Sequence, residues 1–168
     1  MPQFILKITS PADRPVQDPA VGCYIIDAAL PEDFCARFVK EARDAGRLTL
    51  FDGDNALALC RKLGADGVLA RVNDDSPYKK QLKPLREALS GGKILGAVCP
   101  PTRHAAMIVS EIEPDFVAFA WREEDKALPE LLKWYNELFL IQSALEISGS
   151  LPPAESDFII MPAKDFGC

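Results

Sequence analysis

Residues 48–72, LTLFDGDNALALCRKLGADGVLARV, contain the pattern that most limits how this chain can fold. Short apolar runs at residues 48–51 and 67–72 predict two strands, and the apolar spacing between them predicts a helix. Asp54 suits the N-cap of that helix, and Gly64 suits its C-terminal end. A right-handed crossover places two strands joined in this way parallel in one sheet. The stretch therefore predicts a βαβ unit.

The rest of the chain repeats this alternation. We expect strands at residues 4–8, 23–28, 48–51, 67–72, 94–98, 116–121, 139–145 and 158–161. Helices are expected between each pair of successive strands from the second to the seventh. One of them contains Pro84, so it should start near Pro84 or be kinked there. Thr102 is the expected N-cap of the following helix.

Eight strands alternating with helices predict an α/β protein of one domain, residues 1–168, with a closed (β/α)₈ TIM-barrel-like sheet. The barrel is abridged, because no helical pattern follows strands one, seven and eight. Lys7 and Thr9 are expected on the outer face of strand one, which a helix would normally cover. An open doubly-wound sheet is the alternative. Strands seven and eight are apolar on parts of both faces, so an exposed apolar patch, and with it a homodimer, is expected at the helix-poor flank.

Charge and cysteine content narrow the functional class. The net charge is −6 and the pI is about 4.9, which argues against nucleic-acid binding and against an anionic membrane surface. The five cysteines show no paired spacing, so we expect free thiols in a reducing cytoplasm. The N-terminal apolar run has no basic segment before it, unlike a secretory signal, and no run is long enough for a membrane span.

The order of these segments resembles the thiamine-phosphate synthase and thiazole tautomerase family of (β/α)₈ barrels. The best match is residues 48–72, where the family has a strand, an Asn-Asp pair, a short helix and Gly-Ala-Asp-Gly-Val. A weaker match is KILGAVCPPTRHAAMIVSEIEPDFVAF, which is similar to the family's fifth strand, helix and sixth strand. The resemblance implies a transferase that joins a pyrimidine diphosphate to a thiazole phosphate with Mg²⁺ bridging the diphosphate.

The resemblance also implies metal-binding residues, and here the chain departs from the family. Asp52 matches the metal aspartate after strand three, and Asp74 or Asp75 matches the second one after strand four. The basic run that holds the diphosphate after strand two is absent, since this chain has Tyr-Ile-Ile-Asp-Ala at residues 24–28. The family's residues after strands five to eight are also replaced. A normally active synthase is therefore not expected.

Other side chains at the predicted strand ends are candidates for ligand binding. Arg71 and Arg122 are candidates for a phosphate site unlike the family's, Trp121 for packing on an aromatic ring, and Cys99 for a thiol nucleophile. The alternative for the arginines is that they balance acidic loops. The alternative for Cys99 is a small buried apolar residue. His104, the only histidine, is expected on the surface or near a helix cap.

A similar choice applies to the acidic residues. Asp27, Asp52, Asp54, Glu146 and the pair after strand four would gather at one mouth of the barrel and bind a divalent cation, or loop aspartates simply cap helices and solvate turns. Three functions stay open: a divergent barrel that binds a phosphorylated or thiamine-related ligand without synthase activity, an active Mg²⁺-dependent enzyme on thiazole or pyrimidine phosphates, and an interaction module that docks through its helix-poor flank.

Overall fold

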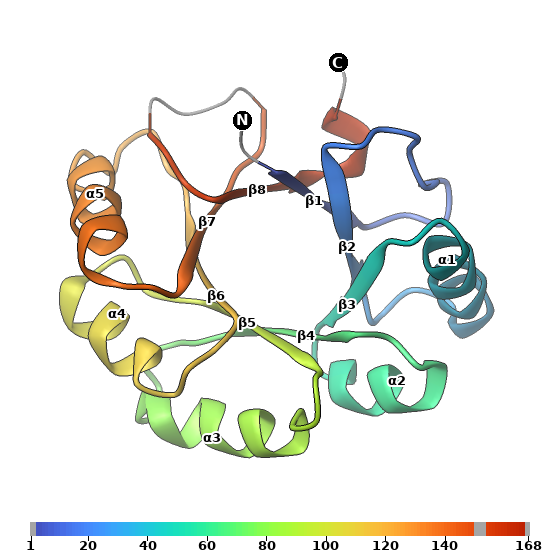
Figure 1. Cartoon of the computed structure of the whole chain (residues 1–168), viewed down its shortest axis with the longest axis horizontal. Helices are drawn as coiled ribbons and strands as arrows, with labels where there is room; N and C mark the ends of the chain where they lie inside the picture. Colours follow the sequence, from blue (N-terminus) through green and yellow to red (C-terminus); the bar gives the residue numbers. More distant parts are fainter. Residues whose placement is uncertain (1–2, 150–153, 167–168) are drawn as a thin grey trace.

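The computed structural model describes residues 3–149 and 154–166, and its eight strands form one closed, all-parallel barrel (Figure 1). Each strand pairs with the next in sequence, and β1 pairs with β8 to close the ring. The strands are β1 (Gln3–Ile8), β2 (Val21–Asp27), β3 (Leu48–Asp52), β4 (Gly67–Arg71), β5 (Ile94–Val98), β6 (Phe116–Ala120), β7 (Gln142–Glu146) and β8 (Phe158–Pro162). The predicted barrel is confirmed, and the open sheet is excluded.

Helices follow β2 to β6, as predicted. They are α1 (Glu32–Asp44), α2 (Ala56–Leu63), α3 (Tyr78–Ala88), α4 (Arg103–Ser110) and α5 (Leu128–Leu138). In the described part of the chain no α-helix follows β1, β7 or β8, and only a short 3₁₀ helix, η1 (Ala163–Asp165), lies beyond β8. Figure 1 shows the five helices around the left, lower and right parts of the ring, and the strands β8 and β1 at the top without a covering α-helix. None of the described helices has the length and apolar character of a membrane span.

Alternation along the strands divides the core into two clusters. Outward residues pack under the helices, whereas inward residues fill the barrel. We call the N-terminal end of the interior the barrel floor; it is lined by Ile5, Cys23, Leu50, Phe116 and Phe158. Its buried side chains are apolar, although Gln3, Asp115 and Gln142 also line this end, so hydrophobic burial is its main contribution to stability.

The flank without helices is covered by loops and by η1. Leu6 and Ile8 point outward from β1 and are fully buried. The Phe166 ring packs edge-on against Phe4, with ring centroids 5.1 Å apart. In the loop after β1, the Val16 amide donates to the Tyr24 hydroxyl at 3.0 Å. Segments without α-helical structure therefore replace the missing helices.

At this flank, two expectations from the sequence differ from the structure. Lys7 does not lie on the outer face of β1, because its neighbours Leu6 and Ile8 take that face and Lys7 points inward. The apolar residues expected to be exposed on strands seven and eight are buried at Leu145, Ile159 and Met161, whereas Leu138 and Leu140, just before β7, are exposed. The homodimer stays a prediction.

Three local boundaries also differ from expectation. Helix α3 begins at Tyr78 and continues through Pro84, which lies on the exposed side, where water can replace the hydrogen bond that proline removes. Asn55, not Asp54, precedes α2, and it makes no side-chain cap. β7 begins at Gln142, because Phe139 instead stacks on Tyr135 as the last residue bonded to α5. Thr102 caps α4 as predicted.

Candidate functional site

Four charged side chains meet at the C-terminal end of the barrel interior, which we call the barrel mouth: Lys7 of β1, Asp52 of β3, Arg71 of β4 and Glu146 of β7. Each stands two residues beyond an inward apolar residue of its strand, so the two-residue period of a strand directs all four inward. This end of a parallel barrel is where barrel enzymes place their active sites.

Arg71 connects the two carboxylates. Its Nη1 and Nη2 donate to Glu146 Oε1 and Oε2 at 2.8 and 2.6 Å, a bidentate pair. Its Nε and Nη2 donate to Asp52 Oδ2 at 3.1 and 2.9 Å. Four of the five guanidinium N–H donors are therefore used within the barrel mouth. The Arg71 side chain is still 44% exposed, so this group faces solvent.

Glu146 is the most buried member, with 10% of its side chain exposed. Burial by itself raises the pKa of its carboxyl, but hydrogen bonds and charges from Arg71 and Lys7 outweigh it, and the pKa lies below its ordinary value. Lys7 Nζ stands 3.5 Å from Glu146 Oε2. The carboxylate is thus ionised at neutral pH and holds two cations.

The acidic residues expected to bind Mg²⁺ do not come together. Asp52 is paired with Arg71, whereas Asp74 lies in the exposed loop after β4 and accepts a hydrogen bond from the Tyr78 hydroxyl. The neighbouring Asp75 is also exposed, and its backbone amide donates to the Asn73 side-chain oxygen. No three His, Cys, Asp or Glu side chains in the described ranges could hold a metal ion. These donors do not fit the magnesium site that the resemblance implies.

The other acidic candidates stay apart as well. Asp27 lies beside Asp52 in the register of β2 and β3, but its Oδ1 accepts from the backbone amide of Ala29. Asp54 is exposed in the turn before α2. Both aspartates therefore lie outside the ion pairs of the barrel mouth.

Two of the predicted ligand-binding residues face the helix layer. Cys99 belongs to the outer core cluster and does not point into the barrel mouth. Burial, with a smaller contribution from Asp74, raises the pKa of its thiol to about 12, so the thiolate needed for nucleophilic attack is not formed at neutral pH. Trp121 is partly buried against the same outer cluster. Arg122 is exposed after β6, and no ion pair links it to the rest of the described chain.

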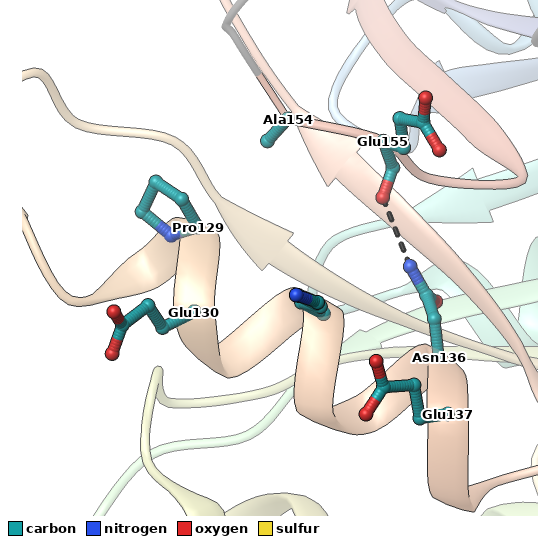
Figure 2. Close-up of a pocket in the computed structure, with 7 residues that line it drawn as sticks. Pro129, Glu130, Asn136, Glu137, Ala154 and Glu155 are labelled. Atoms are coloured by element: carbon teal, nitrogen blue, oxygen red, sulfur yellow. Dashed lines mark hydrogen bonds between the residues drawn. The ribbon is translucent and has the colours of Figure 1, made fainter.

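A cavity of about 880 Å³ lies away from the barrel mouth between α5 and residues 154–155. Figure 2 shows Asn136 of α5 donating to the Glu155 carbonyl across it, at 2.9 Å. Its lining carries three glutamates, Glu130, Glu137 and Glu155, against one lysine, Lys133. That charge disfavours a phosphorylated ligand. We therefore take the barrel mouth as the candidate site.

Sequence reasoning identified Arg71, Asp52 and Glu146 but missed Lys7. The alternation of strand one was recognised, but Lys7 was placed on the wrong face. Its position two residues after the inward Ile5, near the end of an apolar strand, is the signal that would have identified it.

Solved structures confirm the fold. Tryptophan synthase from M. tuberculosis superimposes with a TM-score of 0.67 at 12% identity, covering 96% of this chain and 83% of that one. Citrate synthase SbnG gives a TM-score of 0.61 at 12% identity, covering 96% of this chain and 86% of that one. At such low identity, the likeness concerns the barrel alone.

Curated relatives give the family resemblance. No family model matches the chain. The thiamine-phosphate synthase of Erythrobacter litoralis is 32% identical over 122 residues, which are 67% of this chain and 54% of that protein. The enzyme of the same name from Rhodospirillum centenum is 30% identical over 115 residues, 64% of this chain and 52% of that protein. The chain thus spans about half the length of the curated relatives it matches. The predicted resemblance is confirmed: this chain is a thiamine-phosphate-synthase-like (β/α)₈ barrel.

Proposed function

We propose that this barrel binds a phosphorylated small molecule at its mouth and does not catalyse the usual synthase reaction. One observation carries the proposal: Asp52, which the resemblance assigns to the metal, is engaged by Arg71 together with Glu146. A guanidinium therefore lies beside the carboxylate that would otherwise hold Mg²⁺ against a diphosphate. The basic run that would hold the diphosphate is also absent after β2.

Lys7 and Arg71 supply the donors for an anionic group. Lys7 has a single, long contact within the barrel mouth, so its ammonium keeps donors for a ligand. Arg71 Nη1 keeps one N–H that is not used by Glu146. Both cations contact the same carboxylate oxygen, Glu146 Oε2, so one phosphoryl group is wide enough to bridge them. The name of the similar proteins, thiamine-phosphate synthase, supports a thiamine-related ligand.

The cysteines support a reducing compartment for the protein. The described cysteines are free and buried: Cys23, Cys35, Cys60 and Cys99. Buried free thiols persist where the compartment is reducing. We therefore include the cytoplasm in the proposal.

Isothermal titration and thermal shift with pyrophosphate, thiamine phosphate and thiazole phosphate test the proposal. A ligand that binds only the folded state raises the melting temperature by mass action. Lys7→Met should weaken such binding about tenfold, the effect of losing one charge-assisted hydrogen bond of about 1.4 kcal/mol. Lys80→Met is a matched control, because Lys80 lies on the surface of α3.

A synthase assay with both phosphorylated substrates and Mg²⁺ completes the test. No thiamine phosphate should form. Product formation at a rate that Asp52→Asn abolishes would favour the active enzyme instead, and no binding of any phosphate compound would remove the ligand-binding proposal.

A further inference from the structure

Two carboxylates from distant strands converge on one atom in the barrel mouth. Arg71 Nη2 lies 2.9 Å from Asp52 Oδ2 and 2.6 Å from Glu146 Oε2. Asp52 ends β3 and Glu146 ends β7, so these oxygens meet only because the sheet closes into a ring. Carboxylate oxygens that converge on one point are how proteins hold hard divalent cations. Here the point is occupied by a nitrogen of the protein itself.

We infer that Arg71 is a built-in counter-ion that takes the place of a divalent cation between Asp52 and Glu146, so that the barrel mouth receives anionic ligands without a metal. The part that concerns ligands rests on the proposed function; the part that concerns metal exclusion does not.

Charge balance supports the inference. The two carboxylates are matched by two cations, Lys7 and Arg71. A divalent ion placed among them would meet two like charges, and two unit charges about 4 Å apart near a protein surface repel by about 4 kcal/mol. The ion would also have to displace a guanidinium that makes four hydrogen bonds.

The donor set supports it as well. Mg²⁺ demands six oxygen ligands in near-octahedral order, and it is usually held by carboxylates that are free to accept it. Of the other acidic candidates, Asp27 accepts from the Ala29 backbone amide, and Asp74 and Asp75 lie in the exposed loop after β4, where Asp74 accepts from the Tyr78 hydroxyl. Without Arg71, however, Asp52 would lose its ion pair and Glu146 would keep only Lys7, and both carboxylates would face the same point.

Removal of the guanidinium tests this directly. Arg71→Met keeps an apolar stem of similar length, removes the guanidinium from both carboxylates and leaves Lys7 beside Glu146. Mn²⁺ is the probe, because its binding is followed by calorimetry and by the loss of the free-ion electron paramagnetic resonance signal. We expect no Mn²⁺ bound by the natural chain at about 0.1 mM, which is on the order of the Kd of weak Ca²⁺-binding modules, and at least a tenfold gain in affinity for Arg71→Met.

Matched variants locate the gained site. Arg71→Met combined with Asp52→Asn should lose the added Mn²⁺ affinity, because one ligand is gone. Arg71→Lys should not gain it, because the positive charge is kept. Circular dichroism checks folding of each variant, and Arg71→Gln serves if Arg71→Met does not fold.

Two results would overturn the inference. Mn²⁺ binding by the natural chain that Asp52→Asn abolishes would show that the guanidinium does not occupy the cation position. A folded Arg71→Met or Arg71→Gln chain with no gain in Mn²⁺ affinity would also contradict it.

Pyrophosphate titrations with and without a chelator distinguish this inference from the proposed function. Pyrophosphate binding measured in excess EDTA should equal binding without EDTA. Binding that appears only with Mg²⁺ overturns metal independence and leaves ligand binding standing. Absence of pyrophosphate binding in both conditions removes the proposed ligand, whereas the Mn²⁺ measurements still decide the role of Arg71.

Discussion

The two ends of the barrel interior are built on the same strands but do opposite things. At the barrel floor the inward residues are apolar and packed, as with Phe116 against Phe158, whose ring centroids are 6.0 Å apart. At the barrel mouth, the inward residues are charged: Arg71 follows the inward Leu69 by two residues, and Glu146 follows the inward Ala144 by two. One step of the strand period thus separates a region that stabilises the fold from a region that can bind charge. Substitutions at the two ends should therefore have separable effects.

Phe116→Ala should have the largest effect on stability. Phe116 is 5% exposed and lies inside the barrel, and removing a buried aromatic side chain typically lowers the free energy of unfolding by about 3–5 kcal/mol. Urea unfolding followed by circular dichroism measures the loss. The folded variant should bind Mn²⁺ and pyrophosphate as the natural chain does. Altered ligand binding would show that the barrel floor and the barrel mouth are not separable.

Gly96→Ala should destabilise the same region by overpacking. A Cβ added at Gly96 would lie 2.2 Å from Phe116 Cζ, so the ring must move, at a typical cost of about 1–3 kcal/mol. In a chain that already carries Phe116→Ala, the added methyl has room and the cost should shrink. A double-mutant cycle in urea measures this coupling. Additive effects would contradict contact between the two positions.

Arg71→Met should cost less than either floor substitution. The Arg71 side chain is nearly half exposed, so solvent screens its ion pairs, and we expect a loss of about 1–2 kcal/mol in the free energy of unfolding. Added salt should reduce the difference between the natural chain and the variant. A loss as large as that of Phe116→Ala would mean that the mouth, like the floor, is a main source of stability.

Glu146→Gln should give the smallest change, visible chiefly as a pH effect. Because the folded pKa of Glu146 lies below its ordinary value of 4.5, its ionised form adds stability above that pH, and this contribution is lost as pH falls through the lower folded pKa. The variant lacks the titrating group, so its unfolding free energy should decline less steeply below pH 4.5. Urea titrations from pH 7 to about 3 compare the slopes. Equal slopes would contradict the assignment.

The same contrast explains how much the sequence could predict. Strand order and helix positions followed from apolar periodicity, which local sequence carries, and the barrel followed from the number of units. The turn residue Gly64, with φ 71°, also lies where its identity predicts. The course of α3 past Pro84 could not be predicted, because it depends on that residue's facing solvent.

The candidate site was less predictable, because its contacts join residues far apart in sequence. Arg71 and Glu146 were named from their places at strand ends, but their pairing depends on closure of the ring. Cys99 was misplaced for a related reason: a shift of one residue along a strand changes the face, and strand ends are where the register is hardest to assign. Asp52 lies at the strand end where it was expected, but its ion-pair partner is Arg71 of the same chain.

The pairing of β1 with β8 has a consequence for how the molecule reaches its fold. That seam joins Gln3 to Phe158 and Lys7 to Pro162, the most distant strands in the sequence. Contacts of such long range are slow to form, because the chain between them must first be ordered. Until the seam closes, β1 has an open edge that can pair with another molecule. Refolding is therefore expected to be most prone to aggregation in its last step, and this vulnerability disappears once the ring is complete.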